Sequence, residues 1–166
     1  MKNNKIDKII IATGGTGGHV IPAYSLAIHF IEKKINVKII SDKRGLRYLK
    51  NLNNLEIIQI NSATIFDKSI FKFFVSALII SYSIIRSFIF LLLNRPNIVF
   101  GMGGYSSFPV CIAAKILQIP FIIYENNLHI GKANKYLLPL SRKFFVSYSE
   151  LQGVSKKYRY KVCRIG

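Results

Sequence analysis

Short apolar runs alternate with amphipathic segments along the whole chain. The first apolar run covers residues 9–11. After it, apolar residues recur at the i, i+3, i+4, i+7 and i+8 positions of a helix with one buried face, at Ala23, Leu26, Ala27, Phe30 and Ile31. Later runs predict further strands, at residues 37–40, 56–60, 97–100, 121–124, 143–147 and 161–165. Helices are expected at residues 45–52 and 109–117.

This alternation of strands and helices indicates an α/β fold with a doubly wound parallel sheet, that is, a Rossmann-like domain. The 166 residues suffice for one domain with a substantial core. Neither an internal repeat nor a low-complexity linker interrupts the pattern. We therefore expect residues 1–166 to form a single domain.

Residues 70–93 break the pattern because they are almost continuously apolar. Basic residues lie in or beside this segment, at Lys68, Lys72, Arg86 and Arg95. The uncharged stretch between two of them is 13 residues long, shorter than the roughly 20 that a membrane span needs, which disfavours a transmembrane helix. A helix buried against the sheet would show a clearer polar face. We expect residues 66–93 to dock on an anionic membrane surface; a codon bias toward Ile and Phe is the competing explanation.

The net charge of +17 favours an anionic partner, such as nucleic acid, an anionic membrane or a phosphorylated substrate. Lysine, isoleucine and asparagine are all abundant, however, which is typical of AT-rich codon usage and inflates lysine without a function. Nucleic acid is disfavoured as a partner because no known motif places basic and aromatic residues on one face. Cys111 and Cys163 match no metal spacing, so we expect free thiols in a reducing compartment.

Residues 12–22, with the sequence ATGGTGGHVIP, join the first predicted strand to the first helix. Their glycines let the backbone turn sharply and approach a ligand without a Cβ in the way. The free N–H groups at the start of the helix, with the positive end of the helix dipole behind them, would then face that ligand. Such a turn suits a phosphate or diphosphate, and His19 adds a titratable group inside the anion site.

Two familiar nucleotide-binding motifs fit this turn poorly. A P-loop needs a lysine after the glycines, and none follows here. The dinucleotide fingerprint G-x-G-x-x-G fits Gly15 and Gly17, but Val20 occupies the third glycine position. Asp42 nevertheless stands near the end of the second strand, where a ribose could be held, so NAD binding stays open as an alternative. A strand–helix turn that binds nothing is the other alternative.

Two more polar or glycine-rich loops follow the fourth and fifth predicted strands. Their sequences are GMGGYSS at residues 101–107 and ENN at residues 125–127, the latter running on to Gly131 and Asn134. In an open parallel sheet, ligands bind outside the carboxyl ends of the strands, near the switch in strand order. Three such loops at one edge of the sheet therefore predict a binding site.

Together, the three loops resemble those of the MurG family, the peptidoglycan N-acetylglucosaminyltransferases. The matching segments are GGTGGHVIP at 14–22, GMGGY at 101–105 and YENN at 124–127, in the same order and with sensible spacing. The resemblance implies a GT-B fold, in which two Rossmann-like domains face each other across a cleft. It covers only the N-terminal, acceptor-side domain; the C-terminal nucleotide-sugar domain is expected to be absent from this chain. The chain would then be a fragment of such an enzyme or one member of a split pair.

The reaction that this resemblance implies transfers N-acetylglucosamine from UDP-N-acetylglucosamine to the muramoyl sugar on undecaprenyl diphosphate, converting lipid I to lipid II with inversion. It implies no tightly bound cofactor and no metal. The implied partners are UDP-N-acetylglucosamine, lipid I, the missing C-terminal domain and the membrane. The implied location is the cytoplasmic face of the bacterial inner membrane, as a peripheral protein.

The resemblance also assigns roles to residues of the three loops. His19 is the candidate catalytic base, with hydrogen bonding to a diphosphate as a rival role, and Glu125 is a second candidate base or an orienting group. The donor-binding candidates are Thr16, Gly17, Gly18 and Asn127. The acceptor-binding candidates are Gly15, Gly103, Gly104, Tyr105 and Asn134.

Three positions beside the expected site depart from the family pattern. The family more often has His and Gln on either side of the glutamate, where this chain has Tyr124 and Asn126. It also usually has Gly where this chain has Phe108. The alternatives to an active transferase are a membrane-recruiting subunit that is catalytically silent by itself and, less favoured, a dinucleotide-binding domain.

Overall fold

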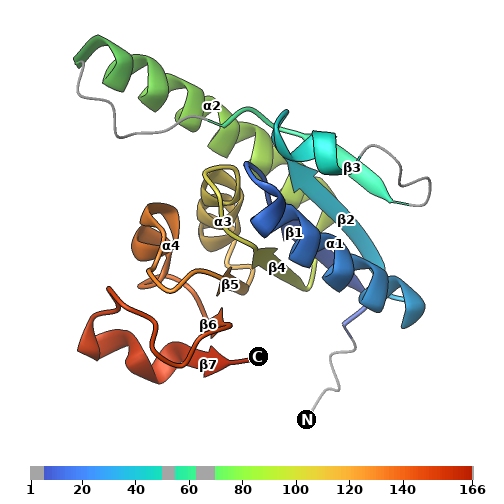
Figure 1. The fold of residues 1–166 in the computed structure, drawn as a ribbon. Coiled ribbons are helices and arrows are strands. Elements are labelled where there is room, and N and C mark those ends of the chain that lie inside the picture. Colours follow the sequence, from blue (N-terminus) through green and yellow to red (C-terminus); the bar gives the residue numbers. More distant parts are fainter. Residues whose placement is uncertain (1–5, 50–54, 63–69, 166) are drawn as a thin grey trace.

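A computed structural model of the chain describes residues 6–49, 55–62 and 70–165, and of residues 70–73 only the backbone. Its centre is a parallel sheet with the strand order β3-β2-β1-β4-β5-β6-β7 (Figure 1). The strands are β1 (Lys8–Ala12), β2 (Asn36–Ser41), β3 (Glu56–Gln59), β4 (Ile98–Gly101), β5 (Phe121–Glu125), β6 (Lys143–Val146) and β7 (Val162–Arg164).

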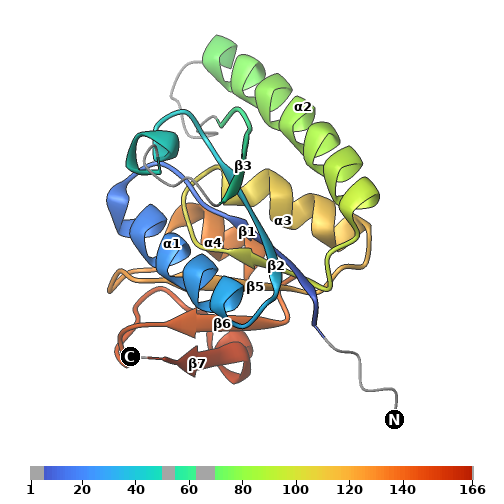
Figure 2. The same cartoon turned by 90° about the vertical axis from the view of Figure 1, so that its right-hand side faces the viewer.

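Helices cover both faces of this sheet (Figure 2). On one face lies α1 (Gly17–Glu32), and on the other lie α3 (Ser107–Ile116) and α4 (Lys132–Leu137). The long helix α2 (Ile70–Asn94) packs on the outer side of α3. Two short 3-10 helices complete the described part of the chain, η1 (Gly45–Tyr48) and η2 (Lys156–Lys161).

The core lies on both sides of β1. Ile9 and Ile11 pack with the α1 residues, whereas Ile10 and Ala12 pack with the α3 residues, and all four are almost completely buried. Because alternate side chains of a strand point to opposite faces, a strand covered on both faces needs an unbroken apolar run. The run KIIIA supplies it.

The strand order reverses direction between β1 and β4, which are direct neighbours. Ala12, the last residue of β1, pairs with Gly101, the last residue of β4. The loops that leave these two strands therefore start side by side, and they start at the switch point where open α/β sheets bind ligands. This register places the first two glycine-rich loops against each other.

The predicted doubly wound sheet is confirmed, and each predicted strand is present with boundaries that differ by one or two residues at most. The helix expected at 45–52 is wrong in type, because the described part, Gly45–Tyr48, forms a 3-10 helix and residues 50–52 lie outside the described residues. Neither α4 nor η2 was predicted, since both are too short for helical periodicity to be visible. Cys111 is buried, Cys163 is half-buried, and both are free thiols.

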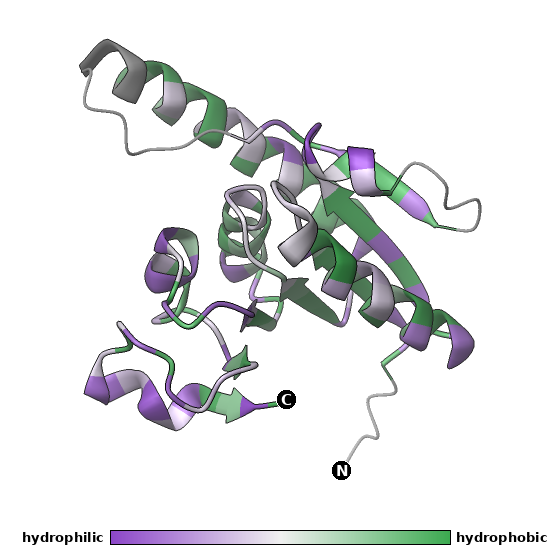
Figure 3. Cartoon of the chain, viewed as in Figure 1, coloured by the Kyte–Doolittle hydropathy of each residue, from purple (hydrophilic) through white to green (hydrophobic). Residues whose placement is uncertain are grey.

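Helix α2 is apolar on its outer side as well as on the side that packs on the domain, where Ile80 and Leu91 are buried. Its outer surface carries large exposed hydrophobic residues: Phe74, Val75, Leu78, Tyr82, Ile85, Ile89, Leu92 and Leu93. Toward the domain it buries two serines, Ser83 and Ser87, each only 1% exposed. Figure 3 shows this apolar helix extending beyond the rest of the fold. The apolar surplus of this segment therefore lies on the side of α2 that faces away from the domain.

Among the described residues, Phe74–Asn94 is the helix that is long and apolar enough to cross a membrane by length and composition, with a mean hydropathy of 2.0. Only 17% of its most apolar window is buried in the domain. Of the basic residues considered with it, Arg86 and Arg95 are exposed, whereas Lys68 and the side chain of Lys72 lie outside the described residues.

Candidate functional site

The first glycine-rich loop runs from the end of β1 into α1. Gly15 has a φ of +81°, a conformation that an L side chain rarely adopts, and it turns the chain toward the helix. Thr16 is the N-cap in extended conformation, and its side chain is exposed and does not cap the helix. The His19 N–H donates to the Thr16 carbonyl oxygen at 3.1 Å, which leaves the N–H groups of Gly17 and Gly18 as the ones at this helix end that can meet an anion.

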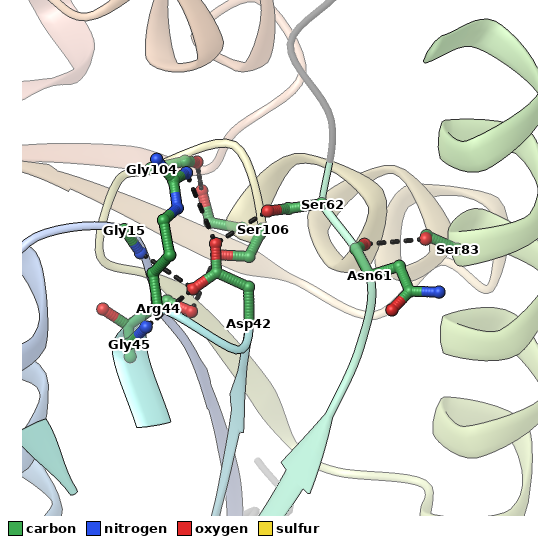
Figure 4. Close-up of polar contacts among 11 residues, drawn as sticks. Gly15, Asp42, Arg44, Gly45, Asn61, Ser62, Ser83, Gly104 and Ser106 are labelled. Carbon is green, nitrogen blue, oxygen red and sulfur yellow. Dashed lines mark hydrogen bonds and ion pairs between the residues drawn. The ribbon is translucent and has the colours of Figure 1, made fainter. Parts of the chain in front are cut away.

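Asp42, at the end of β2, holds this loop (Figure 4). Its Oδ1 accepts hydrogen bonds from the backbone N–H of Gly15 at 3.0 Å and of Gly45 at 2.8 Å. Its Oδ2 accepts one from the Ser62 hydroxyl at 2.7 Å and lies 3.6 Å from the Arg44 guanidinium. Burial alone would raise the pKa of Asp42, but these partners outweigh it and hold the pKa below the ordinary aspartate value.

The alternative of NAD binding loses its main support with this geometry. The Asp42 carboxylate is 3% exposed and both of its oxygens are engaged, so it cannot also hold a ribose. Val20, at the third position of the fingerprint, is completely buried and fills the α1 core instead of allowing a close approach. The sequence offered Asp42 as a possible ribose ligand, whereas in the structure it holds the first loop.

The second loop follows β4 and packs directly on the first. Gly103 and Gly104 have φ values of +89° and +77°. A Cβ on Gly104 would lie 2.6 Å from the Gly14 carbonyl oxygen, so only glycine allows the two backbones to touch. The Ser106 hydroxyl donates to the Thr13 carbonyl oxygen at 2.8 Å and ties the loops together a second time.

The third loop is built around Glu125, which is 1% exposed at the end of β5. Its Oε1 accepts from the side-chain and backbone N–H of Asn127, at 2.7 and 3.3 Å. Its Oε2 accepts from the Gly131 N–H at 2.8 Å and from the Asn134 amide at 3.1 Å. Asn134 also donates to the Tyr124 carbonyl oxygen at 2.9 Å. Glu125 therefore fixes the loop from 125 to the start of α4.

The three loops enclose a pocket of about 140 Å³. It is lined by His19, Gly104, Tyr105, Glu125, Asn127, Gly131, Lys132, Ala133 and Asn134. The His19 ring comes from the first turn of α1, and its Nδ1 is buried without a hydrogen-bond partner among the described residues. This nitrogen lies against Gly103, so a polar atom that lacks a partner in the described part of the chain is left inside the wall of the site.

Six of the residues predicted for the site line this pocket, from all three loops. These are His19, Glu125, Asn127, Gly104, Tyr105 and Asn134. Asn127, which the resemblance assigned to the donor side, lies with the acceptor-side residues. The other five candidates lie outside the pocket lining. One of them, Gly103, packs against the His19 ring. The other four form the loop that carries His19: Gly15, Thr16, Gly17 and Gly18.

Sequence reasoning missed two contributors. Asn126 donates from its side chain to the Gly18 carbonyl oxygen at 2.6 Å and so ties the third loop to the first turn of α1. Lys132 lines the pocket and brings a positive charge to it. The sequence hint was that Lys132 directly follows Gly131, at the start of α4. With six residues, however, α4 is too short for its helical periodicity to be recognised. Within the described ranges, no three His, Cys, Asp or Glu residues are grouped to hold a metal ion.

Comparison with known proteins gives a consistent result. Residues 9–146 match the model of the glycosyltransferase family 28 N-terminal domain. A relative from Pelagibacter ubique is 32% identical over 93% of this chain and 43% of its own length. One from Paramagnetospirillum magneticum is 35% identical over 95% of this chain and 43% of its own length. Both are UDP-N-acetylglucosamine–N-acetylmuramyl-(pentapeptide) pyrophosphoryl-undecaprenol N-acetylglucosamine transferases.

Among solved structures, MurG of Acinetobacter baumannii superposes with a TM-score of 0.76. The match covers 95% of this chain and 45% of that one at 22% identity, which establishes a shared fold. The chain thus spans less than half the length of the relatives and of this structure.

Proposed function

The chain belongs to glycosyltransferase family 28, and on that premise we propose that it is the acceptor-side half of an inverting N-acetylglucosaminyltransferase. The proposed donor is UDP-N-acetylglucosamine, the acceptor is lipid I, and the product is lipid II. The observation that carries this proposal is the pocket in which His19, Tyr105 and Asn127 meet from three separate loops. The names of the relatives support the same reaction.

In this reaction the bond between the anomeric carbon and UDP breaks, and a bond to the C4 oxygen of the muramoyl sugar forms. The acceptor hydroxyl gives up its proton, so the protein needs a base beside it. We assign this role to His19, because imidazole takes up protons near neutral pH and this ring lies in the pocket. The rival role, a hydrogen bond to the diphosphate, uses the same position.

Glu125 acts as an orienting group in this proposal. Each of its oxygens already accepts hydrogen bonds, four in total. A carboxylate held by N–H donors on both oxygens keeps its place in the loop. Glu125 therefore contributes to catalysis by fixing the positions of Asn127 and Asn134 in the pocket.

Charge and backbone geometry support the diphosphate of the acceptor as a ligand of this pocket. Lys132 supplies a cation, and the tight turn at Gly104 exposes backbone at the pocket wall. We place the donor nucleotide toward Thr16, Gly17 and Gly18 at the start of α1, outside the pocket lining. A second domain, in the same chain or in a partner subunit, would supply the other donor contacts, so this domain alone is expected to be inactive.

Helix α2 is the proposed contact with the membrane. Its exposed apolar face is too large for a solvated helix, and the exposed Arg86 offers a cation to anionic head groups. Ser83 anchors the opposite face to the domain by donating to the Asn61 carbonyl oxygen at 2.8 Å. This anchoring, together with packing on α3, favours a helix that lies on the membrane over one that crosses it.

The acceptor assignment is tested by flotation of the chain with anionic phospholipid vesicles that contain or lack lipid I. We expect lipid I to increase the bound fraction, and Tyr105→Ala to remove that increase while circular dichroism shows an unchanged fold. Tyr160→Ala, an exposed tyrosine outside the pocket lining, is the matched control. Equal binding of the wild type to both vesicles would refute the assignment.

The membrane contact is tested with the lipid I-free vesicles alone. Glutamate at Leu78 and Ile85, which are 72% and 58% exposed, should abolish binding without unfolding the domain. Ile80 is unsuitable because it is buried in the contact with the domain. Ile116→Glu places the same charge at an isoleucine that is also 58% exposed, on α3, and should bind like the wild type. Undiminished binding of the α2 variant would rule out this helix as the membrane contact.

A further inference from the structure

We propose that Asp42 is a positioning residue of the site: it fixes the first glycine-rich loop and so holds His19, in the first turn of α1, in place at the pocket. This inference rests on the proposed function for the identity of the ligand, the lipid I diphosphate. It adds a residue that belongs to neither the pocket lining nor the predicted site. The chemistry of Asp42 is that of a buried anchor, because it touches the loop and not the ligand.

The contact to Gly15 is the central observation. Gly15 is the residue at which the loop turns, with a φ of +81°, and its N–H points at Asp42 Oδ1 rather than at the ligand space. One residue earlier, a Cβ on Gly14 would meet the Ser106 hydroxyl and lie 2.8 Å from Asp42 Oδ1. The loop is therefore pressed between the second loop and the Asp42 carboxylate, and neither neighbour leaves it room to shift.

The same oxygen also accepts the Gly45 N–H, which fixes the turn into η1. Gly45 is buried against the first loop, because a Cβ added to it would lie 3.0 Å from the Gly14 Cα. One carboxylate oxygen thus holds two backbone segments that are in contact. Charged acceptors make the stronger hydrogen bonds of this kind, and burial strengthens them further.

The second oxygen connects this anchor to α2. It accepts from Ser62, and the preceding residue, Asn61, accepts the Ser83 hydroxyl through its carbonyl oxygen. Figure 4 shows these contacts in sequence from α2 to Gly15. Ser83 is a buried polar residue in an apolar helix, and these contacts explain its position. Its hydrogen bond to Asn61 fixes the segment that contains Ser62, which donates the third hydrogen bond to Asp42.

Replacement of Asp42 by Asn tests whether shape or charge matters. The Asn carbonyl oxygen can accept from both Gly15 and Gly45, and its amide can donate to the Ser62 hydroxyl, so the loop geometry is retained. Asp42→Ala removes all of these contacts. We therefore expect Asp42→Asn to retain most of the Gly15 amide protection and of the lipid I affinity that Asp42→Ala loses.

The direct measurement is amide hydrogen exchange of Gly15 by NMR on the isotope-labelled chain. In Asp42→Ala the Gly15 amide should exchange at least about tenfold faster, the factor for loss of a hydrogen bond to a charged group, while the β1 amides keep their rates. Ser62→Ala should give a smaller increase. Glu56→Gln removes an exposed carboxylate on β3, whose ion-pair partner within the described residues is Lys38, and serves as the control.

The functional measurement is flotation with vesicles that contain or lack lipid I. Asp42→Ala should lose at least about tenfold in affinity for lipid I vesicles, yet bind plain anionic vesicles like the wild type, which a general loss of stability would not produce. Asp42→Asn should retain most of the lipid I affinity. If Asp42→Ala does not fold, Ser62→Ala provides the test with a smaller shift in the same two readouts.

The outcomes separate the two proposals. Unchanged Gly15 exchange and unchanged lipid I affinity in the folded variants would overturn the positioning role. Changed exchange with unchanged lipid I affinity would overturn it as well, because the loop would then move without consequence for the ligand. Equal binding of the wild type to vesicles with and without lipid I would refute the proposed function. The exchange rate of the Gly15 amide would still show whether Asp42 fixes the loop.

Discussion

Gly103 and His19 are in contact in a way that only glycine permits. A Cβ built on Gly103 would lie 2.5 Å from Nδ1 of the His19 ring and 2.7 Å from its Cε1. The residue also has a φ of +89°, where a side chain is strained whatever the space. The second loop thus forms the wall against which the imidazole rests.

Gly103→Ala should displace the His19 ring. We expect altered His19 ring resonances by NMR and a loss of lipid I affinity of about tenfold, with a destabilisation of about 1–2 kcal/mol from the backbone strain. Gly153→Ala is the matched control, because Gly153 has a φ of +84° and a crowded Cβ position but lies in the loop after β6. If Gly103→Ala and Gly153→Ala changed the His19 ring resonances to the same extent, a specific contact between Gly103 and His19 would be contradicted.

Glu125→Gln should destabilise the domain, because one carboxylate oxygen becomes an amide N–H that faces the N–H donors of Asn127 or of Gly131 and Asn134. The expected loss is about 2–3 kcal/mol in the free energy of unfolding, measured by urea denaturation. Glu150→Gln, at an exposed glutamate, should leave the midpoint unchanged. A Glu125→Gln domain as stable as the wild type would favour the role of a base over that of an orienting group.

The contribution of Asp42 to stability should depend on pH. Its pKa is lower in the folded than in the unfolded chain, because its hydrogen-bond partners outweigh burial, so the folded state favours the carboxylate. This stabilisation is complete above the unfolded pKa of about 3.9 and is lost as the pH falls through the lower folded pKa. The difference in unfolding free energy between wild type and Asp42→Asn should therefore be largest near neutral pH. A difference that grows on acidification would show the opposite sign of the pKa shift.

Lys161 should stabilise the edge of the sheet. Its Nζ is buried and donates to the carbonyl oxygens of Leu138, Pro139 and Ser141, at 3.2, 2.8 and 2.7 Å. Lys161→Ala removes all three hydrogen bonds, although the Leu138 carbonyl oxygen keeps the one from the Ser141 hydroxyl, and should cost about 1–3 kcal/mol in unfolding free energy. Lys156→Ala, in the same 3-10 helix but exposed, should change it by no more than about 0.5 kcal/mol, by the same urea titration. Equal effects of both substitutions would exclude this role for Lys161.

Most strands and helices of the fold could be predicted from the periodicity of apolar residues. The run before the first glycine loop and the residues from Ala23 to Ile31 defined β1 and α1, because burial on two faces or one leaves a period in the sequence. Elements of a few residues, such as α4, leave no such period. The inward-facing Ser83 and Ser87 could not be predicted either, because the local pattern cannot tell which face of α2 meets the domain.

The sequence by itself determined the loops, their order along the strands and the residue types that suit an anion and a base. Tertiary structure alone decided how those residues are used. It made Asp42 a buried anchor, engaged all of the acceptors of Glu125 and set His19 against Gly103. The physical reason is that hydrogen bonds and close contacts between loops join residues up to 108 positions apart, as between Asn126 and Gly18, and no local pattern records such pairs.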